Sequence, residues 1–317
     1  MAAMWCPIIG LLLLLLPLGP SSAIKFPLIG NVYPDGHFYA TLQIGKPLKT
    51  YFLDIDTGSN LTWLECEHPD HGCKGCNQRT PHPYYKPAAH NLMVKCDSWI
   101  CAQLRKDLPG SPQCPNSDPH RCHYDIQYVS GRSKGDLAND MIFINRRDDM
   151  NYVFGCGYEQ EEPLEQPSPP AVDGILGLGR GSVGFVAQLK AQKKIVRNVI
   201  GHCLSIHGNG NLYIGDFRLP PGDVTWAPMS TSLFETPSIN LDIPPENYLI
   251  VTKDGNACLA ILDGSSDRVL RHLILIGDVT MQDLFVIYDN EVNGIGWVRA
   301  QCDRMQDLES VIIDSRL

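Results

Sequence analysis

The chain has 317 residues, of which 44% are apolar and 19% are charged, so it can bury the core of one large or two ordinary domains. Its 26 basic and 35 acidic residues give a net charge of −9. That charge argues against a general nucleic-acid binder, which needs a basic face.

The longest apolar run lies at the N-terminus, from Ile8 to Leu16. It is too short to cross a bilayer, and the small residues Ser21 and Ala23 behind it suit a signal peptidase. We therefore predict a signal peptide over residues 1–23, export into the secretory pathway and no stable membrane span. The alternative is a buried N-terminal helix.

The rest of the chain is dominated by short segments with strand-like alternation and turn residues between them. Strands are predicted at residues 38–44, 49–55, 124–128, 152–155, 211–214, 248–252, 257–262, 284–288 and 294–298. One helix is predicted to begin at Ser182, a good N-cap residue, because Val183, Val186 and Leu189 follow at helical spacing. The fold class indicated is all-β.

Cysteines are concentrated in the first half of the chain. Eleven of the twelve remain after the predicted signal peptide, and seven lie within 57 residues: Cys66, Cys73, Cys76, Cys96, Cys101, Cys114 and Cys122. In an exported chain such a cluster predicts loops joined by disulfides. The C-x-x-C of Cys73 and Cys76 leaves zinc as the alternative, but no second C-x-x-C follows at the spacing of a zinc ribbon. We expect no metal and no cofactor, and the odd count leaves at least one thiol without an intrachain partner.

A carboxylate on a tight glycine turn follows the predicted strand at 49–55, in the order Asp56, Thr57, Gly58 and Ser59. A turn of this kind can hold a carboxylate rigidly at the edge of a cleft. Taken alone, the motif is more typical of an Asx turn that binds its own backbone.

Five motifs in fixed order give this turn its context. They are residues 52–63 around Asp56, 126–135 around Tyr128, 173–178, 275–281, and 286–289 followed by 295–297. In this order, from about Tyr39 to Cys302, the chain resembles the pepsin-like aspartic proteases, specifically their plant nucellin-like branch. The resemblance implies a bilobal fold, with an N-terminal lobe over residues 24–222 and a partial C-terminal lobe over 223–317.

The same resemblance implies a function and its residues. Asp56 would be a catalytic aspartate in the loop Thr57, Gly58 and Ser59, Tyr128 would be the tyrosine of the flap that closes over a peptide or protein substrate, and Trp63 would support it from behind. Plain structural roles are the alternatives, a core residue for Trp63 and an exposed hairpin residue for Tyr128. We expect a monomer that is extracellular (in the apoplast) or vacuolar.

The chain departs from this family in one respect, because it has no second D-[ST]-G upstream of Gly277. The nearest match, Asp263-Gly264-Ser265, has the wrong order and lies too close to that glycine. The missing strands are predicted to fall between about Met229 and Leu241, and by resemblance Cys258 would pair with a cysteine in them. The sequence thus predicts an aspartic endopeptidase by descent, or alternatively a catalytically dead binding or inhibitor-type protein.

Overall fold

The computed structural model describes residues 23–67, 72–75, 84–87, 92–108, 110–111, 114, 120–128, 131–145, 148–161, 172–229, 239–265 and 275–305. The predicted signal peptide, apart from Ala23, lies outside the described residues. The N-terminal part contains β1 (Ile24–Asn31), β2 (His37–Ile44), β3 (Lys49–Asp56), β4 (Trp63–Glu65), α1 (Trp99–Asp107), β5 (His123–Tyr128), β6 (Gly131–Asn145), β7 (Asp148–Glu161), β8 (Gly174–Gly177) and α2 (Phe185–Ala191).

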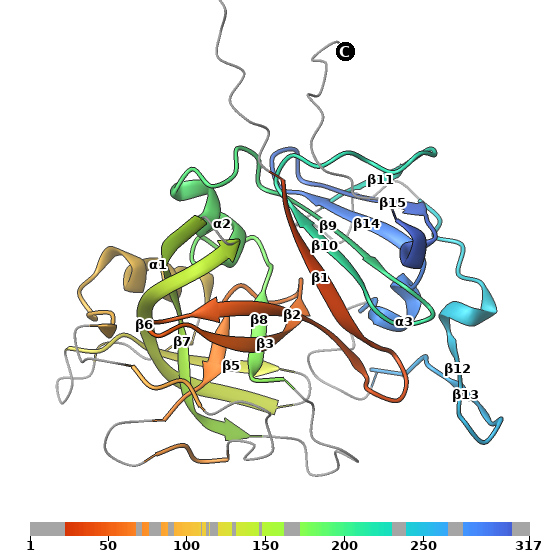
Figure 1. Cartoon of the computed structure of the whole chain (residues 1–317). Helices are drawn as coiled ribbons and strands as arrows, with labels where there is room; N and C mark the ends of the chain where they lie inside the picture. Colours follow the sequence, from red (N-terminus) through yellow and green to blue (C-terminus); the bar gives the residue numbers. More distant parts are fainter. Residues whose placement is uncertain are drawn as a thin grey trace, which may run out of the picture.

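The C-terminal part contains β9 (Val199–Leu204), β10 (Gly210–Ile214), β11 (Thr225–Pro228), the 3₁₀ turn η2 (Pro245–Asn247), β12 (Leu249–Val251), β13 (Ala257–Leu259), α3 (Asp278–Met281), β14 (Leu284–Asp289), β15 (Gly294–Arg299) and the 3₁₀ turn η4 (Cys302–Arg304). Each strand predicted from the sequence is present. The all-β prediction is therefore confirmed (Figure 1).

Thirteen strands form one continuous sheet in the order β11-β15-β14-β9-β10-β1-β2-β3-β8-β4-β7-β6-β5. Strand β1 joins its two halves: Ile24 to Leu28 pair with β10, and Ile29 to Asn31 pair with β2 (Figure 1). A separate two-stranded sheet consists of β12 and β13.

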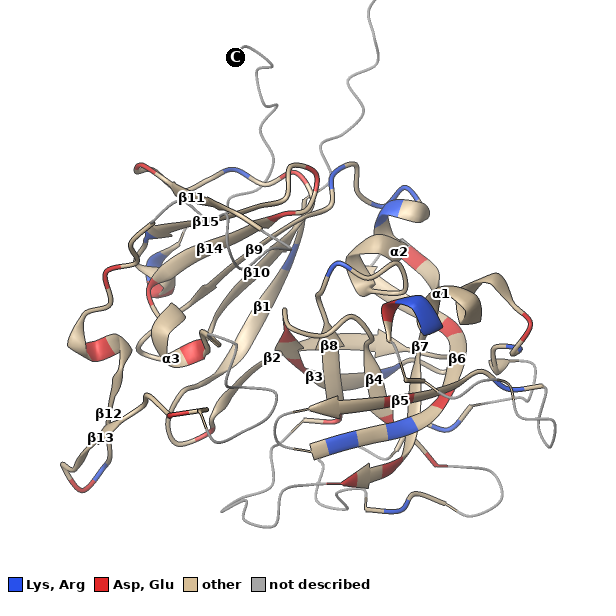
Figure 2. Cartoon of the chain, turned by 180° about the vertical axis from the view of Figure 1, so that it is seen from behind, with Lys and Arg blue, Asp and Glu red and all other residues tan. Residues whose placement is uncertain are grey.

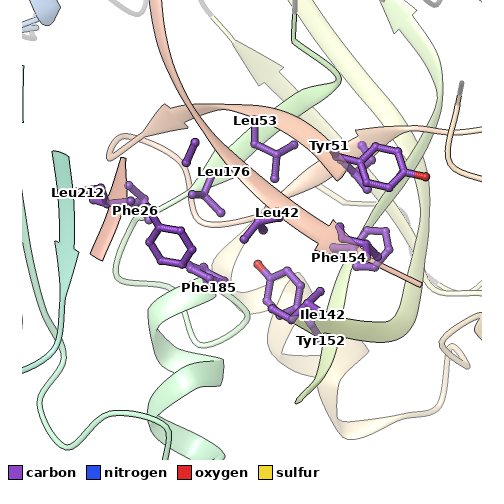
Figure 3. Packing of buried hydrophobic residues seen from close by; sticks show 14 of the residues in the cluster. Phe26, Leu42, Tyr51, Leu53, Ile142, Tyr152, Phe154, Leu176, Phe185 and Leu212 are labelled. Carbon is purple, nitrogen blue, oxygen red and sulfur yellow. The ribbon is translucent and has the colours of Figure 1, made fainter. Parts of the chain in front are cut away.

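The larger core fills the N-terminal lobe between the strands and α2. Figure 3 shows the aromatic side chains of Phe26, Tyr152, Phe154 and Phe185 packed together there, and all four are buried. Phe185 lies at the first position of α2, which therefore buries its apolar face against the strands. A smaller core is built from strands on both sides of the predicted lobe boundary at residue 222, with β9 and β10 before it and β14 and β15 after it.

The predicted helix start at Ser182 is wrong, because α2 begins three residues later at Phe185 with Gly184 as its N-cap. Asp107 explains the difference. Its carboxylate accepts hydrogen bonds from the Ser182 hydroxyl and from the Val183 backbone N–H, both at 3.0 Å. These bonds hold the two residues in a turn instead of in the first turn of the helix.

The prediction of a disulfide-stapled region is confirmed. Disulfides join Cys66 to Cys156, Cys96 to Cys114, Cys101 to Cys122 and Cys203 to Cys302. Cys73 is also disulfide-bonded, so it has no thiolate to offer to zinc. Cys76 lies outside the described residues. Among the described residues no group of His, Cys, Asp or Glu side chains is arranged to hold a metal ion.

Candidate active site

Asp56 is the last residue of β3, which lies between β2 and β8 in the middle of the N-terminal half of the sheet. Its Oδ1 accepts a hydrogen bond of 2.8 Å from the Gly58 backbone N–H. This is the contact of an Asx turn, so it orients the carboxylate without distinguishing a catalytic from a structural role. The distinction has to come from what surrounds the loop.

Behind the loop runs β8, parallel to β3, with Gly177 in register with Asp56. The backbone N–H of Leu178 donates to the Asp56 carbonyl oxygen at 2.8 Å. A Cβ on Gly177 would lie 2.6 Å from the carbonyl carbon of Leu61, so only glycine fits at this crossing. The motif at residues 173–178, with two apolar residues before Gly177 (an apolar-apolar-Gly segment), therefore passes directly behind the Asp56 loop.

Tyr128 and Trp63 meet next to this loop. The Trp63 indole Nε1–H donates to the Tyr128 hydroxyl at 2.8 Å, and the ring centroids lie 6.5 Å apart. Burial raises the pKa of Tyr128, and the negative charge of Asp56 raises it further. The structure therefore brings together the two aromatic residues that the sequence had paired, within electrostatic reach of Asp56.

A chain of contacts links the loop to the C-terminal lobe. Thr57 Oγ1 donates to the Tyr288 hydroxyl across 3.3 Å, and that hydroxyl lies 3.9 Å from the sulfur of Met281, the last residue of α3. Asp278 begins the same short helix. Figure 2 shows α3 on the side of the C-terminal lobe that faces β2 and β3.

Three carboxyl groups interact at this junction. Burial and the charge of Asp56 together raise the pKa of Asp278 to about 6. Burial raises the pKa of Asp54 well above its usual range, and the charges of Asp278 and Asp56 add to that shift. Sequence reasoning did not single out Asp278. The signal that could have found it is its place directly after Gly277 in the second apolar-apolar-Gly segment.

Among the described residues, no loop encloses this second segment, residues 275–277. Leu275 and Ile276 are 64% and 48% exposed, and a Cβ added to Gly277 would meet no atom within 4 Å. In the N-terminal lobe the equivalent Leu176 is fully buried and Gly177 is tightly enclosed. The contrast indicates that the C-terminal lobe lacks its own catalytic loop.

A cavity of about 640 Å³ lies beside the loop that is present. Thr57 and Gly58 line one side, and Met229, Tyr288 and Ile295 line the other. Two catalytic carboxylates must lie about 3 Å apart to share a proton, so a second loop would have to sit against the first. The cavity adjoins Met229, which is where the missing segment was predicted to begin.

His202 is the buried neighbour of Tyr288, with ring centroids 5.9 Å apart, and its Nδ1 has no hydrogen-bond partner among the described residues. Burial lowers the pKa of His202 from 6.5 to about 4. The unfolded chain therefore binds more protons between these pH values, so the stability that neutral His202 contributes is lost as pH falls from 6.5 to 4.

We expect His202→Phe to remove this dependence. The difference in unfolding free energy between variant and wild type should change by about 3 kcal/mol in favour of the variant between pH 7.5 and pH 4. Urea unfolding at several pH values measures it. Asp54 and Asp278 change the stability with pH in the opposite direction, but they do so in both proteins and cancel when the two unfolding free energies are subtracted. A difference in unfolding free energy that stays the same at every pH would contradict the expectation.

Comparison with known proteins identifies relatives of the whole chain. The family model for the N-terminal part of xylanase inhibitors matches residues 38–216, and the model for their C-terminal part matches residues 226–299. The chain is 36% identical over 405 residues to an aspartic proteinase of rice (Oryza sativa subsp. indica), covering 96% of this chain and 97% of that protein. It is 29% identical over 215 residues to aspartic proteinase 36 of Arabidopsis thaliana, covering 62% of this chain and 42% of that protein.

Two solved structures share the fold. Basic 7S globulin from soybean superposes with a TM-score of 0.62 at 15% identity, covering 92% of this chain and all of that one. Conglutin gamma from lupine seeds superposes with a TM-score of 0.59 at 16% identity, covering 88% and 95%. At these identities the likeness concerns the fold alone.

The rice alignment also supports a missing segment. It is 405 positions long, whereas this chain has 317 residues, so at least 88 positions (405 less 317) face a gap in this chain. No helix among the described residues is long and apolar enough to cross a bilayer. With both family models matched in order and the rice protein aligned almost end to end, the chain belongs to the pepsin-like aspartic protease family, in its plant xylanase-inhibitor-like group, and lacks part of the second lobe.

Proposed function

We propose that the chain is an aspartic-type endopeptidase in which Asp56 activates water. The observation that carries this proposal is the intact loop at the end of β3, held by β8 and adjoined by the Trp63–Tyr128 pair. We further propose that Asp278 supplies the acid that the missing loop would otherwise provide. Its coupling to Asp56 and its pKa of about 6 support that role.

The chemistry follows from the two protonation states. Ionised Asp56 takes a proton from water as the water oxygen attacks the peptide carbonyl carbon, and protonated Asp278 gives its proton to the carbonyl oxygen. The tetrahedral diol then returns a proton to Asp278 and re-forms the carbonyl. The C–N bond breaks as Asp56 passes its proton to the leaving nitrogen.

Replacement of either carboxyl tests this proposal. Asp56→Asn and Asp278→Asn should each lower kcat/KM for a denatured protein substrate by about 10²- to 10⁴-fold, because an Asn has no proton to exchange. Wild-type activity should fall as pH rises above about 6, where Asp278 loses its proton. Asp263→Asn is the matched control, since that exposed carboxylate accepts hydrogen bonds from Ser265 alone within the described part of the chain.

The outcomes separate the two parts of the proposal. Full activity in Asp56→Asn would exclude the endopeptidase assignment. Loss in Asp56→Asn with full activity and an unchanged pH profile in Asp278→Asn would leave the endopeptidase assignment intact and remove Asp278 from the mechanism.

A catalytically dead binding or inhibitor-type protein is the second candidate. The open surroundings of Gly277 favour it, because half of the floor of a substrate cleft has no loop in place. Two of the solved structures that share this fold are basic 7S globulins, one from soybean and one from lupine seeds. Tight binding of a peptide at pH 5 without turnover, unchanged in Asp56→Asn, would favour this candidate.

We also propose that the chain is exported, to the apoplast or the vacuole. The disulfides described above support this, since such bonds persist in oxidising compartments. Sequencing the N-terminus of the protein isolated from plant tissue tests it, and a mature start near Ile24 is the expected result.

A further inference from the structure

The β12–β13 hairpin stands apart from the large sheet. Figure 1 shows it projecting from the C-terminal lobe beyond η2 and α3. Several apolar side chains on the hairpin and just after it face solvent: Val251 is 64% exposed and Leu259 60% exposed in the two strands, and Ile261 beyond β13 is 63% exposed. An apolar two-stranded sheet of this kind is marginal alone in water and exposes backbone groups that can pair with another chain.

The hydrogen bonds of the hairpin identify its open edge. Thr252 N–H donates to the Asn256 carbonyl and Ala260 N–H donates to the Tyr248 carbonyl, both at 2.8 Å. Hydrogen-bonded pairs alternate along an antiparallel ladder, so the pair between them, Ile250 with Cys258, is hydrogen-bonded as well.

It follows that the two residues that flank Cys258 turn their polar backbone groups away from β12. Ala257 and Leu259 occupy the alternate positions of the ladder, and both are exposed. Their N–H and C=O groups therefore line the outer edge of β13. Such an edge accepts a further antiparallel strand.

A thiol lies at the centre of that edge. Cys258 is exposed and free, whereas the other cysteines within the described part of the chain are all in disulfides. In an exported protein an unpaired cysteine of this kind favours intermolecular pairing.

We propose that β13 is a dimerisation strand, and that two copies of the chain pair through it in antiparallel fashion about a two-fold axis at Cys258, joined by a Cys258–Cys258 disulfide. On this axis Ala257 of each copy lies opposite Leu259 of the other. Because all four residues direct their backbone groups outward, they form two hydrogen-bonded pairs. The two Cys258 residues then occupy the non-hydrogen-bonded pair between them.

The geometry of that position suits a disulfide. Cα atoms of a non-hydrogen-bonded pair are about 4.5 Å apart, and disulfides require a Cα separation of about 4.4 to 6.8 Å. A second copy is the occupant that places a thiol opposite Cys258 at this register while also covering Leu259 and Ile261. The contact lies away from Asp56, and the dimer replaces the monomer expected from the sequence.

The covalent step is thiol–disulfide exchange with a protein or low-mass disulfide of the secretory pathway. One Cys258 thiolate attacks that disulfide and releases one thiol, forming a mixed disulfide. The Cys258 thiolate of the second copy attacks the mixed disulfide and releases the other thiol. Two cysteine thiols are oxidised and one disulfide is reduced to two thiols, so electrons and protons balance.

Non-reducing electrophoresis of the full chain refolded in a mixture of reduced and oxidised glutathione tests the proposal. We expect wild type to migrate at twice the mass of the reduced chain and Cys258→Ser to migrate as a monomer with the same circular dichroism. Wild type that stays monomeric, including as a glutathione adduct, would overturn the proposal. So would a dimer that persists in Cys258→Ser.

A charge pair tests the register independently. A257K/L259K places Lys opposite Lys at both flanking pairs and should slow dimer formation about tenfold. A257E/L259K places Glu opposite Lys at the same pairs and should restore the wild-type rate. Equal rates for the two double variants would exclude this register, whatever the fate of the disulfide.

Discussion

In the Asp278→Asn variant, restoring a second catalytic loop should raise kcat/KM by about 10²- to 10⁴-fold, the usual contribution of a positioned acid–base partner. The insertion takes the segment of the rice aspartic proteinase that faces the gap and places it between Met229 and Leu241. Its loop would fill the cavity beside Thr57 and Gly58 and give Gly277 a backbone to pack behind. A peptidase assay at pH 4 to 6 measures the gain.

The control for this chimera is the same insertion with the aspartate of its D-[ST]-G changed to Asn. This control should have the same packing and stability of the C-terminal lobe as the chimera, but it should not show the gain in kcat/KM. A chimera that is folded and no faster than Asp278→Asn would mean that the second loop supplies no acid–base partner to Asp56.

Removal of the Cys203–Cys302 disulfide should cost about 4 to 5 kcal/mol of unfolding free energy. The bond closes a loop of 99 residues and joins β9 to the end of the described chain at η4. Loop-closure entropy grows with the logarithm of loop length, which gives about 4.7 kcal/mol for such a loop. The variant is Cys203→Ala with Cys302→Ala, and urea unfolding at pH 7 measures the loss.

The Cys101–Cys122 disulfide provides the comparison, since both pairs are fully or almost fully buried. It closes a loop of only 21 residues, so its removal should cost about 3 kcal/mol by the same relation. A smaller loss for Cys203 and Cys302 than for Cys101 and Cys122 would mean that strain or residual structure in the unfolded chain outweighs loop length.

The strands that the sequence predicted are those with alternation or with a family motif. Residues 38–44 alternate cleanly, and β2 covers them because one face packs on the core. Strand β9 was not predicted, since all six of its residues, including His202, are buried and leave no period of two to detect. Helix α1 was also not predicted, although Ser98 caps it by accepting a hydrogen bond from the Cys101 N–H.

The candidate site was predictable where chemistry is local in sequence. Asp56 to Ser59 form one turn, and Trp63 and Tyr128 follow from the family order. Asp278 was not predictable in the same way, because its interaction with Asp56 joins positions 222 residues apart (278 − 56). That interaction depends on how Tyr288 and α3 pack against Thr57, and no local sequence pattern predicts this packing.

Strand β1 cannot complete its pairing until β10 has been synthesised. It leaves the ribosome early, but Ile24 pairs with Ile214, 190 residues later in the chain (214 − 24). At about 5 to 20 residues per second, its outer edge waits roughly 10 to 40 s for β10. During that interval the nascent chain presents an open strand carrying Phe26 and Leu28, both buried in the finished protein, so chaperone engagement should concentrate there.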